Sequence, residues 1–188
     1  MKHLLTPILR GAPRGLKTLF VGLNPSRFSV ENGYHFSSES PFFYFLNEAG
    51  ITPQEIAPGF ARTELISLDI GLTDLFPDLD YTKQEETAAE VRRRGEGYLR
   101  SCQDELHRAI QKCTPRVVVF LGRLGPSLYY SSSEKKFGFG ILQQELLIDN
   151  PRPIVFVARF PTGRPNYEQL ILENYEMLRA LINSISYP

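Results

Sequence analysis

Three short apolar runs along the chain have the length and composition of buried strands. They are Thr18–Val21, Val117–Leu121 and Ile154–Ala158, and each is followed by glycine- or proline-containing turn chemistry. A weaker run, Leu65–Ile70, ends at Gly71. Because continuous apolar runs of this length are typical of strands buried on both faces, the pattern predicts a mostly parallel sheet of four strands.

The segments between these runs have the residue patterns of helices. Phe42–Ala49 predicts a short aromatic helix, and Gln84–Lys112 predicts a long helix interrupted near its two internal glycines. Tyr167–Asn183 carries its apolar residues on one side, as an amphipathic helix does. Asn166, with a glutamine three residues further on, predicts a capping box at the start of that helix.

Strands that alternate with helices favour an α/β fold with helices on both faces of the sheet. We therefore expect a three-layer α/β/α sandwich around a central, mostly parallel, four-stranded sheet. The 188 residues are enough for one compact domain, so we expect residues 1–188 to form a single domain. In such sheets ligands bind beyond the carboxyl ends of the strands, where the loops that follow the apolar runs should gather.

The charge of the chain is balanced in total but unevenly distributed. Lysine plus arginine is 21 and aspartate plus glutamate is 21, which gives a net charge of zero. Residues 1–27 hold five basic residues and no acid, residues 150–166 hold three arginines and no acid, and residues 39–90 hold eleven acids. A neutral total argues against a histone-like protein, but two acid-free segments can meet in one patch that binds nucleic acid.

Cysteine and histidine are too scarce for a disulfide framework or a metal cluster. The chain has two cysteines and three histidines, and Cys102, His107 and Cys113 do not share one face of the predicted long helix. We expect no metal and no cofactor. No stretch reaches about 18 apolar residues, and the N-terminus does not read as a signal peptide. We expect an intracellular monomer, in the nucleoid-associated cytoplasm or in a nucleus.

The loop Gly22-Leu23-Asn24-Pro25-Ser26 follows the first apolar run and is the sharpest motif in the chain. Gly22 lets the backbone turn tightly and Pro25 stiffens the loop, so the Asn24 amide is held at the sheet edge. An amide oxygen can accept a hydrogen bond from water, and its NH₂ can donate to the carbonyl of a base. The same residues are also common in Asx-turns and helix N-caps.

Two further motifs follow along the chain. Gly33-Tyr34-His35-Phe36 offers an aromatic ring that can stack on a base, although such clusters also pack into cores. Gly71-Leu72-Thr73-Asp74-Leu75 places an ionisable group in an apolar stretch. A carboxylate there can orient a water or stabilise a cationic sugar, or it can cap a turn.

The segment Pro161-Thr162-Gly163-Arg164-Pro165 joins the third run to the last predicted helix. Its backbone N–H groups can approach phosphates and Arg164 can reach into a groove of DNA, or the segment is a solvated surface loop.

The order and spacing of these motifs over residues 17–183 resemble the mismatch-specific uracil/thymine DNA glycosylase family of the uracil-DNA glycosylase superfamily. The resemblance implies that Asn24 positions the attacking water, that Phe36 stacks on the flipped base and that the backbone of Leu23 reads the base edge. It also implies two groups of contacts. Base-binding residues would be Gly22, Leu23, Pro25, Tyr34, His35 and Phe36, and DNA-binding residues would be Ser26, Arg27, Gly122, Arg123, Thr162, Gly163 and Arg164.

The sequence departs from the family pattern at four sites. Phe43 and Tyr44 stand where the family often has Phe-Trp. Ser26 replaces a second glycine, Asp74 replaces a lysine or asparagine, and Phe160 replaces a polar residue before the segment that would wedge into the duplex. Asp74 can act as a second catalytic residue beside Asn24. The resemblance implies a monofunctional glycosylase that removes uracil, or thymine or another deaminated base, from mismatched double-stranded DNA. A noncatalytic binder of damaged DNA and a small-molecule hydrolase are the alternatives.

Overall fold

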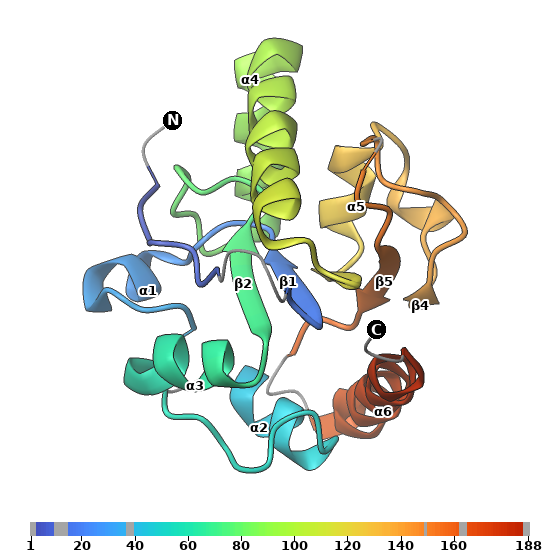
Figure 1. The fold of residues 1–188 in the computed structure, drawn as a ribbon. Helices are drawn as coiled ribbons and strands as arrows, with labels where there is room; N and C mark the ends of the chain where they lie inside the picture. Colours follow the sequence, from blue (N-terminus) through green and yellow to red (C-terminus); the bar gives the residue numbers. More distant parts are fainter. Residues whose placement is uncertain (1–2, 10–14, 37–39, 149, 162–164, 186–188) are drawn as a thin grey trace.

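The computed structural model describes residues 3–9, 15–36, 40–148, 150–161 and 165–185. A central sheet has the strand order β2-β1-β3-β5-β4, in which β4 is antiparallel to β5 and the other neighbours are parallel. The strands are β1 (Thr18–Gly22), β2 (Ile70–Asp74), β3 (Val117–Leu121), β4 (Gly140–Ile141) and β5 (Ile154–Ala158). Helices cover both faces (Figure 1), which confirms the predicted α/β/α sandwich.

Six α-helices and three 3₁₀ turns connect the strands within the described ranges. The α-helices are α1 (Arg27–Asn32), α2 (Phe42–Glu48), α3 (Ala61–Ser67), α4 (Gln84–Cys113), α5 (Leu124–Tyr129) and α6 (Glu168–Ser184). The 3₁₀ turns are η1 (Pro58–Phe60), η2 (Glu134–Lys136) and η3 (Pro165–Tyr167). Among these residues, no helix combines the length and the apolar character needed to cross a membrane.

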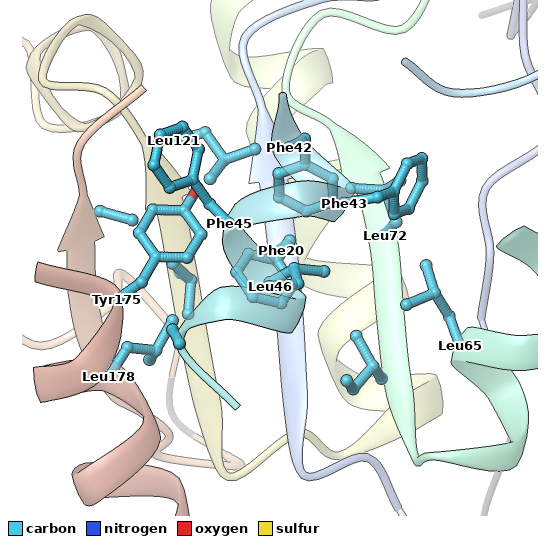
Figure 2. Packing of buried hydrophobic residues seen from close by; sticks show 14 of the residues in the cluster. Phe20, Phe42, Phe43, Phe45, Leu46, Leu65, Leu72, Leu121, Tyr175 and Leu178 are labelled. Carbon is cyan, nitrogen blue, oxygen red and sulfur yellow. The ribbon is translucent and has the colours of Figure 1, made fainter. Parts of the chain in front are cut away.

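Two hydrophobic cores lie on opposite faces of the sheet. Phe20 of β1 points into the core formed with α2, α3 and α6, whereas its neighbours Leu19 and Val21 point into the core formed with α4 and α5. Figure 2 shows the first core, where Phe42 of α2 packs against Phe20 and Phe45 of α2 lies beside Tyr175 of α6. Alternate side chains of one strand therefore fill two cores, which explains why the apolar runs are continuous.

The predicted strand Leu65–Ile70 is wrong. Residues Ala61–Ser67 form α3, and strand β2 begins only at Ile70. Ala61 and Leu65 are both buried, at the four-residue spacing of a helix face. Asp69, with a φ of 57°, turns the chain between helix and strand. The fifth strand, β4, was not predicted because its two residues are too short to form a pattern.

The three predicted helices are present, and the start of the last one differs from the prediction. The long helix α4 is interrupted at Gly95, with φ 79° and ψ −175°, as predicted for this region. The predicted capping box at Asn166 is wrong, because Pro165–Tyr167 form a 3₁₀ turn and no side chain caps α6. Gln169 instead donates from Nε2 to Glu173 Oε1 at 3.0 Å, one helical turn along.

Candidate active site

A cavity of about 360 Å³ lies at the carboxyl end of β1 and β2. It brings together the loop after β1, the end of β2, the start of α4 and the residues after β5. Ser26 and Phe160 both line it, so the two acid-free sequence segments meet here. Of the residues singled out from the sequence, the cavity lining includes Gly22, Leu23, Asn24, Pro25, Ser26, His35, Phe36 and Asp74.

The Asn24 amide is fixed by three hydrogen bonds. Its Nδ2 donates to the carbonyl oxygens of Pro25 and Tyr81, each at 2.8 Å. Its Oδ1 accepts from the hydroxyl of Thr87 at 2.8 Å, and Thr87 is completely buried in α4. The two carbonyls take up both N–H groups and so define which end of the amide is oxygen. One acceptor position on Oδ1 then remains for a water in the cavity.

Ser26 and Arg27 begin helix α1 beside this cavity. The Ser26 hydroxyl accepts from the Ser29 backbone N–H at 3.1 Å and thereby caps the helix. This accounts for a serine where the family pattern has glycine. Arg27 is exposed and its Nε lies 3.9 Å from Asp80 Oδ2, so its ion pair is solvent-screened and leaves the guanidinium accessible.

Phe36 contributes an aromatic surface to the cavity. Its ring stacks on Phe42 with centroids 4.1 Å apart and an interplanar angle of 17°. The backbone of Phe36 has a φ of 57°, a conformation that bulky residues rarely adopt. A strained backbone therefore holds the ring between the first hydrophobic core and the cavity. Tyr34, from the same motif, is not among the residues that line the cavity.

Replacing Phe36 by alanine is expected to lower kcat/KM on uracil-containing DNA roughly 5- to 150-fold, which corresponds to about 1–3 kcal/mol of lost base stacking. Paired and unpaired uracil should be affected alike. Steady-state kinetics and thermal melting of the Phe36→Ala and Phe36→Leu variants would measure this. Leucine keeps apolar volume but removes the ring. A Phe36→Ala protein that melts earlier with unchanged kinetics would make Phe36 a core residue only.

Asp74 is the last residue of β2 and pairs in register with Gly22 of β1. Its side chain is 9% exposed and its Oδ2 lies 3.5 Å from Nδ1 of His35. A β-carbon on Gly22 would overlap Asp74 Oδ1, so the missing side chain of Gly22 makes room for the carboxyl group. Burial raises the pKa of Asp74, and the neighbouring His35 opposes that rise.

One hydrogen bond to the backbone orients the ring of His35 beside Asp74. Its Nε2 is 3.2 Å from the carbonyl oxygen of Thr6, which can only accept, so Nε2 carries a hydrogen. Its other ring nitrogen, Nδ1, faces the Asp74 carboxyl at 3.5 Å. His35 and Asp74 form a buried imidazole–carboxyl pair, and the alternative role of Asp74 as a turn cap has no bond to support it among the described residues.

The remaining predicted DNA contacts lie beside this cavity or outside the described residues. Gly122 and Arg123 follow β3 and line a neighbouring cavity. Thr162, Gly163 and Arg164 lie outside the described residues.

Several residues that shape the site could not be identified from the sequence. Thr87 and the Tyr81 carbonyl hold Asn24 although they lie 63 and 57 positions away in the chain. Gln84, at the start of α4, also lines the cavity. Nothing in the local sequence marks these residues, because their roles arise only when α4 packs beside β1.

The described part of the chain holds no group of three His, Cys, Asp or Glu side chains placed to bind a metal ion. Two separate His–carboxylate pairs are present. His35 lies against Asp74, and His3 Nε2 lies 3.1 Å from Glu105 Oε2. The side chains that line the cavity include an amide, a buried carboxyl–imidazole pair and an aromatic ring.

Comparison with known protein families matches residues 10–183 to the uracil DNA glycosylase superfamily. The match spans the whole sheet and all of the residues that line the cavity except Leu5. The fold agrees as well, since a mostly parallel sheet lies between two helical layers. The chain therefore belongs to the uracil DNA glycosylase superfamily, whose members are hydrolases that act on uracil in DNA.

Proposed function

We propose that the protein is a monofunctional glycosylase that hydrolyses the N-glycosidic bond of uracil, or of thymine or another deaminated base, in mismatched double-stranded DNA. It would act as a monomer inside the cell and begin base excision repair. The observation that carries this proposal is the convergence of Asn24, Asp74 and Phe36 on one cavity. None of the described cavity residues is a lysine, so no amine is at hand to form a Schiff base with the sugar.

The reaction begins when the target base leaves the duplex and enters the cavity. Unstacking costs a few kcal/mol and is cheapest for a mispaired base, which favours mismatches. Phe36 would then stack on the extruded base. The backbone around Leu23, at the rim of the sheet, would face the base edge and stabilise the negative charge on the departing base.

Water addition would depend on Asn24 and Asp74. Asn24 Oδ1 accepts a hydrogen bond from the Thr87 hydroxyl and can accept a second one from a water, which places that water at a fixed point in the cavity. As the glycosidic bond breaks, positive charge develops on the sugar. The Asp74 carboxylate would stabilise this charge from the end of β2. Uracil is a fair leaving group, so the water does not need a strong base.

A noncatalytic binder of damaged DNA on the same fold is the second candidate. The buried carboxyl of Asp74 favours the enzyme over this binder. A carboxylate repels DNA phosphates, and its burial is costly, so a protein that only binds DNA gains nothing from it. A glycosylase gains a group that stabilises a cationic transition state.

A cleavage panel tests the proposed function. Oligonucleotides with uracil, thymine or hypoxanthine opposite guanine or adenine, and in single strands, are incubated with excess protein and then treated with alkali to break abasic sites. We expect the fastest release for uracil opposite guanine. Gel shifts on the same oligonucleotides separate the alternatives: specific binding without strand breaks would indicate a binder, and equal rates on all uracil contexts would contradict mismatch selectivity.

EDTA is expected to leave the glycosylase activity unchanged. The proposed chemistry uses an amide and a carboxyl–imidazole pair, and the leaving group needs no Lewis acid. Single-turnover rates on uracil opposite guanine, with and without millimolar EDTA, would check this. A loss of activity that one defined divalent metal restores would contradict the mechanism.

A further inference from the structure

A second cavity of about 340 Å³ adjoins the base cavity. Gln84 and Phe160 line both, so the two cavities share a wall. The second cavity lies where β3 and β5 end, between the residues that follow each strand. Arg123 follows β3, Arg159 follows β5, and Phe139 precedes β4.

Two arginines converge on one aromatic ring in this cavity. The guanidinium carbon of Arg159 lies 4.2 Å from the centroid of Phe139, and that of Arg123 lies 5.4 Å from the same centroid. The backbone N–H of Arg159 donates to Oδ1 of the buried Asn174 at 2.7 Å, which anchors the end of β5. The ring holds both guanidiniums by cation–π attraction.

Neither of these guanidinium groups has an ion-pair partner among the described residues. Glu134 also lines the cavity, but no ion pair joins it to either arginine in that part of the chain. Arg94, by contrast, bonds to both Glu90 and Asp78 at 2.7 Å. Two like charges held at one ring repel each other, and an anion between them would relieve that repulsion. A phosphodiester matches this arrangement because guanidinium groups bind phosphate bidentately.

Two exposed aromatic side chains border the same cavity. Phe160 is 39% exposed and Tyr167 is 47% exposed. Phe160 Cβ would lie 3.6 Å from a β-carbon added to Gly122, so the Phe160 residue rests over that glycine at the shared wall. Exposed aromatic rings next to paired cationic groups are the usual composition of sites that bind unpaired nucleotides, where each ring stacks on one base.

We propose that this second cavity binds the nucleotide next to the excised one, with its phosphate between Arg123 and Arg159 and its base against Tyr167. The proposal rests on the proposed function, because that function identifies the bound molecule as a strand of DNA. Arg123 was expected near a phosphate from the sequence, whereas Arg159, Phe139 and Tyr167 enter only from the structure. A site for a neighbouring unstacked base implies that the protein also takes uracil from single-stranded DNA.

Binding measurements test this without relying on cleavage. The probe is a short, fluorescein-labelled single strand with a stable tetrahydrofuran abasic site, followed by fluorescence anisotropy across a range of salt concentrations. Arg159→Gln should weaken binding about tenfold, the scale of one charge-assisted hydrogen bond. The slope of log K against log salt should fall in magnitude by about 0.7 for each arginine removed.

Arg179→Gln is the matched control. Arg179 is exposed and lines a different cavity together with Thr18 and Ile70. These two are the first residues of β1 and β2, so this cavity lies at the amino ends of the strands, opposite to the proposed site. This variant should bind the probe as the unaltered protein does. Equal affinity and salt slope for Arg159→Gln and the unaltered protein, or the same loss in Arg179→Gln, would overturn the proposal.

Chemical changes in the probe locate the contact. A methylphosphonate at one linkage flanking the abasic site should weaken binding of the unaltered protein and have no further effect on Arg159→Gln. Removing the neighbouring base should weaken the unaltered protein but not Tyr167→Ala. If every flanking methylphosphonate affects both proteins equally, the phosphate assignment is wrong. If the protein binds as described but cleaves no uracil substrate, the proposed function fails and this binding site stands.

Discussion

The Asn24→Ala variant is expected to cleave uracil-containing DNA at least about 10²-fold more slowly in single turnover, with little change in DNA affinity. The reason is geometric. Asn24 Oδ1 is held by the Thr87 hydroxyl, and its NH₂ by two carbonyls, so its remaining acceptor position has one direction in the cavity. Alanine removes the group that would align the attacking water.

The same substitution should also cost stability. It leaves the Thr87 hydroxyl without its Asn24 acceptor and the Tyr81 carbonyl without its Asn24 donor, a loss of about 1–3 kcal/mol for a buried polar group. Thr87→Val is the matched control, because it breaks the same hydrogen bond from the other end and keeps the shape. We expect Thr87→Val to lower the melting temperature but to keep most of the cleavage rate.

Rates must therefore be measured well below both melting temperatures, with the folded fraction checked by circular dichroism. Near-full activity in Asn24→Ala would remove Asn24 from the mechanism. A rate loss in Thr87→Val as large as that in Asn24→Ala would mean that the network orders the loop, and that the amide itself does not touch the water.

Local chemistry allowed much of this site to be predicted from the sequence. Glycine, proline and asparagine after an apolar run mark a rigid loop at a strand end, and the loop after β1 lies there. The buried strands could be recognised in the sequence because both of their faces are apolar. The error at Leu65–Ile70 arose because the end of a short helix and the start of a strand both consist of apolar residues.

Long-range partners could not be predicted in the same way. The buried pair of His35 and Asp74 forms because the loop after α1 folds back over the end of β2. Phe139 and Arg159 meet only because β4 pairs antiparallel with β5, and β4 is too short to leave a pattern. Such contacts depend on topology rather than on neighbouring residues, so they become visible only in the folded chain.

Replacing Asp74 by asparagine is expected to slow single-turnover cleavage at neutral pH by roughly 10- to 100-fold. Asparagine keeps the shape of the side chain, and its NH₂ can donate to Nδ1 of a neutral His35. The fold should therefore survive the change. What is lost is the negative charge that would face the developing sugar cation.

The pH dependence separates this role from a structural one. Burial raises the pKa of Asp74, while His35 and His3 oppose the rise, and Glu105 in turn pairs with His3. The active carboxylate exists above that raised pKa, so the cleavage rate of the unaltered protein should fall as the pH drops through it. Asp74→Asn has no such carboxyl, and its profile should lack this acidic limb.

The contribution of Asp74 to folding stability should change with pH in the opposite direction to the cleavage rate. A carboxyl whose pKa is raised in the folded state favours folding most below its unfolded pKa, and this contribution is lost as the pH rises through the folded pKa. Thermal melting should therefore show Asp74→Asn gaining on the unaltered protein as the pH increases. Parallel shifts of rate and stability, or identical pH–rate profiles, would contradict a catalytic charge at Asp74.

The double variant Asn24→Ala/Asp74→Asn decides whether the two residues act together. Both line the same cavity, from the ends of neighbouring strands. If they act on one water and one cation as a unit, the double variant should be little slower than the slower single variant, since each loss already disables the unit. Multiplying losses would instead mean two independent contributions. Unchanged cleavage of every base by Asp74→Asn would leave Asn24 as the single catalytic residue, and the buried carboxyl would then have only its pairing with His35 to explain it.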